Sequence, residues 1–221
     1  MSPTLKIPMF LAGATATAGV GALAAKGLSP NSEESISSLL SKDLSKRLIS
    51  PDESDYWTQS WKRYKENSDI WNLRKSDSGV PDIFKTTCNN KLESKVSGKD
   101  SQGYKDFLAY CARDTLVSDL IKEMAPNKEL IPSGSTAEWK EAWKKYTSNS
   151  RNSKTASSDG IWKIEDWSTQ HSQPDAPTSF KTKCGSKAKE PSFETTDQLY
   201  LDVLEFCTKD KTPTQAGGVG G

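Results

Sequence analysis

The sequence predicts an all-α protein: two tandem copies of a small, disulfide-clamped helical domain that follow an N-terminal transmembrane or signal helix. Three observations predict this fold. A set of motifs recurs once in the same order, aromatic residues follow helical spacing, and two pairs of cysteines have equal separations. The length of 221 residues allows two small domains.

Four sequence blocks occur twice. Trp-x3-Trp-Lys-x-Tyr-x2-Asn-Ser begins at Trp57 and at Trp139, and Ile-Trp begins at Ile70 and at Ile161. Phe-Lys-Thr-x-Cys begins at Phe84 and at Phe180, and Tyr-x-Asp-x-Leu-x2-Cys-x2-Asp begins at Tyr104 and at Tyr200. Four blocks in one order are very unlikely by chance, so they predict a duplicated domain. The expected organisation is a signal-anchor or signal peptide (1–31), two helical repeats (32–114 and 115–210) and a disordered Gly-rich tail (211–221).

The spacing inside each block is helical. Trp57, Trp61 and Tyr64 fall on one face of a helix, and we expect such aromatic faces to form the core rather than a ligand platform. A helical pattern also runs from Tyr104 to Met124 without Gly or Pro, which predicts one long helix linking the two domains. No strand alternation is visible.

The four cysteines follow the repeat, and the members of each pair are separated by 23 positions in the sequence. The favoured pairing is Cys88–Cys111 and Cys184–Cys207, each bridge contributing about 3 kcal/mol in the chain-entropy model. Buried reduced thiols are the alternative. Disulfides would place both repeats outside the cytoplasm, and no pair has the spacing of a zinc site.

Nineteen uncharged residues, Ile7–Ala25, precede the repeats. As a helix they would measure about 28 Å, close to the thickness of a bilayer's hydrocarbon core. A retained anchor, with the C-terminal part outside, is preferred over a signal peptide cut after Ala22–Ala24. The apolar residues taken to mark the membrane span are Ile7, Phe10, Leu11, Val20, Leu23 and Ala25.

Nothing in the sequence predicts catalysis, a cofactor or a metal site. Thirty Lys and Arg oppose 29 Asp and Glu, which argues against a nucleic-acid partner. The lone His171 falls in an inserted loop, where a solvated side chain is expected. The repeated carboxylates are read as caps and salt bridges, and they are Asp106, Asp114, Asp202 and Asp210. Trp167 has no counterpart in the first repeat and is the one candidate for an exposed contact.

Together these features resemble the large paralogous families of uncharacterised proteins in haemotropic mycoplasmas. The resemblance rests on the Gly- and Ala-rich N-terminal span, the Trp, Phe-Lys-x2-Cys and Tyr-x-Asp blocks, and the Leu-Val-Ser-Asp-Leu sequence at 116–120. It implies a wall-less bacterium on red cells and divergent copies suited to antigenic variation, with no catalytic residues. The expected function is therefore a non-enzymatic, membrane-anchored surface protein that meets a host surface protein. The alternative is a secreted binding module whose aromatic faces hold a peptide or small ligand.

Overall fold

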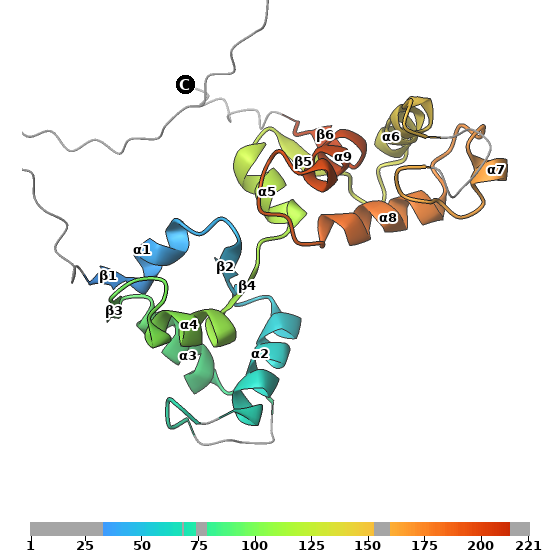
Figure 1. Ribbon diagram of the computed structural model, residues 1–221. Helices are drawn as coiled ribbons and strands as arrows, with labels where there is room; N and C mark the ends of the chain where they lie inside the picture. The colour runs from blue at the N-terminus through green and yellow to red at the C-terminus, as the bar shows by residue number, and fades with distance from the viewer. Residues whose placement is uncertain (1–32, 68, 74–78, 153–159, 213–221) are drawn as a thin grey trace, which may run out of the picture. The chain divides into compact units, whose positions relative to one another are not determined.

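A computed structural model describes residues 33–67, 69–73, 79–152 and 160–212, and this part of the chain is rich in helices (Figure 1). Its helices are α1 (Ile36–Ser41), α2 (Ser54–Glu66), α3 (Asp82–Lys91), α4 (Gln102–Cys111), α5 (Val117–Met124), α6 (Thr136–Ser148), α7 (Trp167–Gln170), α8 (Thr178–Ala188) and α9 (Gln198–Phe206). Its strands are β1 (Glu34–Ser35), β2 (Lys46–Leu48), β3 (Lys95–Val96), β4 (Ala112–Asp114), β5 (Lys128–Leu130) and β6 (Thr208–Asp210). The helical class predicted from the sequence is confirmed.

The expectation of an all-α fold without strands is wrong in detail. β1 pairs with β3, β2 with β4 and β5 with β6, each pair antiparallel. Each strand has only two or three residues. Such short segments cannot display the alternation of polar and apolar residues by which a strand is recognised in a sequence.

The single long helix predicted from Tyr104 to Met124 is also wrong. α4 ends at Cys111, and Ala112 has extended backbone angles (φ −121°, ψ 158°). β4 follows, pairing with β2, and the Thr115 N–H donates to the Ser45 carbonyl oxygen at 2.9 Å. The backbone groups that a continuous helix would satisfy internally are satisfied here by β2 and the loop before it.

Buried apolar side chains form two separate clusters. One lies in residues 33–114, called the first half below, and the other in residues 115–212, the second half. In the first half α2, α3 and α4 supply most of the buried residues, and in the second half α5, α6, α8 and α9 do so. Each half therefore has its own core.

The predicted membrane span, Ile7–Ala25, lies outside the described residues, as does most of the predicted tail. Among the residues that are described, none of the helices combines the length and apolar character needed to cross a bilayer.

Candidate functional site

Both predicted disulfides are present. Cys88 on α3 is bonded to Cys111 at the end of α4, with their Cα atoms 5.4 Å apart. Cys184 on α8 is bonded to Cys207, which directly follows α9, with a Cα separation of 5.5 Å. All four side chains are buried. Each bridge thus clamps two packed helices of one half.

The aromatic face of α2 forms the core of the first half. The rings of Trp61 and Tyr64 stack with an interplanar angle of 13°, and their centroids lie 5.0 and 5.2 Å from that of Phe84. Trp57 donates from its indole nitrogen to the Ser50 carbonyl oxygen at 2.9 Å. None of these four rings is more than 3% exposed.

The aromatic face of α6 forms the core of the second half. Trp143 and Tyr146 stack at 13°, with centroids 5.0 and 4.9 Å from that of Phe180. The indole N–H of Trp139 donates to the Pro132 carbonyl oxygen at 2.8 Å. The prediction that these faces are core, rather than an exposed platform, is confirmed by their burial.

The expectation that Trp167 is an exposed contact is wrong, because this side chain is only 2% exposed. Its ring packs edge-on against Trp143, with centroids 5.7 Å apart, and the Trp143 indole N–H donates to the Gln173 carbonyl oxygen at 3.1 Å. The inserted loop therefore folds back over the core. His171 is half-buried, not fully solvated: its ring stacks on Trp167, and its Nδ1 lies 2.9 Å from the Trp167 carbonyl oxygen.

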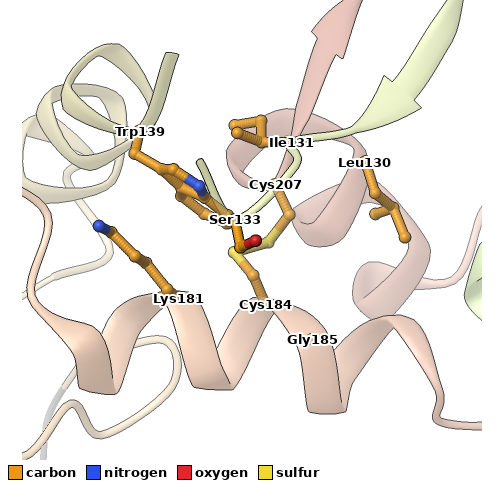
Figure 2. A pocket seen from close by; sticks show the side chains of 8 residues that line it. All are labelled: Leu130, Ile131, Ser133, Trp139, Lys181, Cys184, Gly185 and Cys207. Atoms are coloured by element: carbon orange, nitrogen blue, oxygen red, sulfur yellow. A yellow bond between two sulfur atoms is a disulfide. The ribbon is translucent and has the colours of Figure 1, made fainter. Parts of the chain in front are cut away.

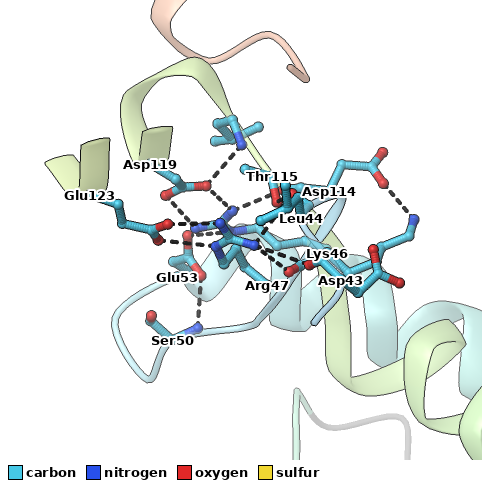
Figure 3. A network of polar contacts seen from close by, with 12 residues as sticks. Asp43, Leu44, Lys46, Arg47, Ser50, Glu53, Asp114, Thr115, Asp119 and Glu123 are labelled. Carbon is cyan, nitrogen blue, oxygen red and sulfur yellow. Dashed lines mark hydrogen bonds and ion pairs between the residues drawn. The ribbon is translucent and has the colours of Figure 1, made fainter. Parts of the chain in front are cut away.

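A network of ion pairs surrounds β4 and the start of α5 (Figure 3). The Arg113 guanidinium, 8% exposed, bonds Glu53 and Asp119 at 2.6 Å each. Asp119 also accepts the Leu116 backbone N–H at 2.8 Å, which caps the first turn of α5. Burial disfavours the charge on Arg113, but its bonds to Asp119 and Glu53 raise its pKa above the usual value. The arginine thus fixes the break between α4 and α5, a role the sequence did not suggest.

Two of the repeated carboxylates form surface ion pairs, as the sequence predicts, whereas Asp202 is buried and Asp106 accepts a hydrogen bond from a neutral side chain. Asp114 pairs with its cross-strand neighbour Lys46 at 2.5 Å, and Asp210 pairs with Lys128 at 2.8 Å. Asp202 is 4% exposed and accepts from an arginine, and Asp106 accepts from a glutamine. Within the described ranges, His, Cys, Asp and Glu do not gather in groups of three or more that could hold a metal ion.

We expect the protein to lose stability at high pH, because three tyrosines lie in its cores. Burial raises the pKa of Tyr64, Tyr104 and Tyr146 to about 12, from an ordinary value near 10. As pH rises, these phenols therefore ionise in the unfolded chain at a lower pH than in the folded chain. Their contribution to the free energy of unfolding is complete below pH 10. It is lost as pH rises towards 12, by roughly 1.4 kcal/mol per pH unit for each tyrosine.

Urea unfolding at several pH values between 9 and 11.5 would measure this loss. Tyr146→Phe removes one of the three phenols, so we expect its free energy of unfolding to fall less steeply above pH 10 than that of the unaltered chain. Identical slopes in the two proteins would contradict the assignment.

A cavity of about 250 Å³ opens beside the second disulfide (Figure 2). It is lined by Leu130, Ile131, Ser133, Trp139, Lys181, Cys184, Gly185 and Cys207. Its walls are mainly apolar, and Lys181 is its single charged residue. Sequence motifs did not reveal it, because its lining comes from segments far apart in the chain, 130–139, 181–185 and Cys207.

The described structure thus offers a disulfide-bonded helical scaffold with one apolar cavity beside a bridge. Comparison of the chain with protein-family models, with curated proteins and with solved structures finds no significant match.

Proposed function

We propose that this chain is a non-enzymatic, membrane-anchored protein of a cell surface. In this proposal its ordered part consists of two tandem copies of one helical domain, and its loops meet a host surface protein or vary to evade recognition. The predicted N-terminal helix would provide the anchor, and the resemblance to the haemotropic mycoplasma families favours the same location.

Matched contacts in the two halves support the tandem duplication. The stacked Trp–Tyr pair has the same angle in both halves, and the ring of a phenylalanine packs against each pair at nearly the same distance. The cross-strand ion pair of Lys46 with Asp114 has its counterpart in that of Lys128 with Asp210. Agreement at this level is what divergence from one ancestral unit would leave behind.

The observation that carries the proposed location is the pair of buried disulfides. Structural disulfides form and persist in oxidising compartments and are rare where thioredoxin and glutathione keep thiols reduced. A small domain also gains most from such a bridge, since its core alone buries little surface. Both considerations favour an exported chain.

The lengths of the loops support a scaffold that tolerates surface variation. The segment between α6 and α8 is longer than that between α2 and α3, yet the stacked rings beneath are arranged alike. Loops that change while the core is kept are typical of proteins whose surface is the functional part.

Flow cytometry of intact cells that produce the protein, with an antibody raised against residues 33–210, tests the proposal. We expect labelling without permeabilisation, and we expect the four cysteines to resist alkylation until a reductant is added. Labelling that requires permeabilisation, or thiols that react directly in living cells, would overturn it.

The alternative is a secreted binding module. Burial of the α2 and α6 rings leaves their aromatic faces unavailable to a ligand, so this alternative loses the surface on which it was based. Mass spectrometry of the mature N-terminus separates the two: an intact 1–31 segment favours the anchor, and cleavage after Ala24 favours secretion.

A further inference from the structure

The cavity beside Cys184–Cys207 has the size of a small-molecule site. A cavity of roughly 150 Å³ with apolar walls binds benzene, and this one measures about 250 Å³. It therefore has room for one aromatic ring with a short side chain. Leu130, 37% exposed, lies at its edge, and the disulfide and the Trp139 ring form its inner walls (Figure 2).

The charge at the cavity specifies the ligand further. Lys181 rises from α8 beside Trp139, with its ammonium 6.0 Å from the ring centroid (Figure 2). Among the described residues no carboxylate forms an ion pair with this lysine, so its ammonium is available to a ligand. The Ser133 hydroxyl on the cavity wall can donate a hydrogen bond to a negatively charged ligand group that pairs with Lys181. An apolar chamber with one cation and one hydroxyl fits an apolar molecule that carries a single negative charge.

Gly185 lines the cavity without a side chain. A Cβ built on Gly185 would have no atom within 4 Å, so the space beside this position is empty. The first half has Asn89 at the matching place, after Cys88, while the preceding lysine, Lys85, lies over Trp57 much as Lys181 lies over Trp139. The two halves thus share the lysine and the tryptophan but differ at the residue after the cysteine, which is exposed in both.

We propose that this cavity binds a small carboxylic acid whose apolar body is about the size of one aromatic ring. The ring lies between Trp139, Ile131 and the disulfide, where apolar surface leaves water. The carboxylate pairs with the Lys181 ammonium at the mouth in a charge-assisted hydrogen bond. Binding requires only the folded second half, so an anchored chain and a secreted chain would bind alike.

Ligand-observed saturation-transfer NMR on the oxidised full chain tests this directly. The probes are 3-phenylpropionate and its uncharged counterpart, 3-phenylpropanamide. We expect saturation transfer to the acid and about tenfold weaker binding of the amide, because only the acid can form the ion pair.

Two variants and one matched control locate the site. Lys181→Met retains the aliphatic stem and should weaken binding of the acid about tenfold without changing binding of the amide. Gly185→Asn adds a side chain to the cavity wall and should weaken binding of both probes, and the open space at this position allows the helix to accept it. Lys85→Met, in the first half, should change nothing. Absent saturation transfer to the acid, or equal losses from Lys85→Met and Lys181→Met, would overturn the proposal. Neither result would bear on surface labelling of cells, which tests the proposed function separately.

Discussion

Replacing Phe180 with alanine should lower the free energy of unfolding by about 3–5 kcal/mol, the range seen when a buried phenylalanine is truncated. Its side chain is fully buried, and its ring lies within 6.1 Å, between centroids, of four other aromatic rings. The variant loses the apolar surface, leaves a cavity and breaks several ring contacts that each contribute about 0.5–1.5 kcal/mol. We expect the loss in free energy of unfolding to lie in the upper part of this range. Urea unfolding monitored by tryptophan fluorescence would measure it.

The first half supplies a matched pair of variants. Phe84→Ala removes the equivalent buried ring and should cost as much as Phe180→Ala. Ile83→Ala removes a large apolar side chain from the adjacent position, where it is 54% exposed, and should cost less than about 0.5 kcal/mol. Similar losses from Phe84→Ala and Ile83→Ala would mean that the α2 aromatic face is not a core, and would restore the ligand-platform interpretation.

The sequence predicted the features that recur. Two occurrences of a motif reveal a constraint that one occurrence cannot, and Cys88 with Cys111 could be paired because Cys184 and Cys207 repeat their separation. The helical aromatic faces were predictable for a second reason, since i, i+4 and i+7 spacing has one structural meaning in a chain with few other large apolar residues. The helix-rich class and the composition of the cores followed from these two patterns.

The features that the sequence did not predict depend on contacts between distant segments. The helical pattern of apolar residues continues past Cys111, but the carbonyl and amide groups of Ala112–Asp114 pair with β2, and this pairing leaves no periodic mark. Trp167 lacks a counterpart, which suggested exposure, yet its loop packs it against Trp143. The cavity lies between segments far apart in the chain, 130–139, 181–185 and Cys207, and motif analysis does not register such an arrangement.

Removing one disulfide should destabilise one half of the protein far more than the other. The two buried clusters are separate, so Cys184→Ala with Cys207→Ala should lower the stability of the second half while the first half unfolds as before. A loop closed over 23 positions contributes about 3 kcal/mol to stability in the chain-entropy model. Alanine is preferred to serine at these buried positions, because a serine hydroxyl without a partner would add its own cost.

The reciprocal pair, Cys88→Ala with Cys111→Ala, should produce the mirror-image result, and hydrogen exchange can assign the loss to α3 and α4 or to α8 and α9. Because the bridges lie in different clusters, the losses in the fourfold variant should add to within about 0.5 kcal/mol. A reductant should destabilise the unaltered chain and leave the fourfold variant unchanged. If either double variant loosens both halves equally, then the two cores stabilise one another, and the description of each half as a unit clamped by its own bridge must be abandoned.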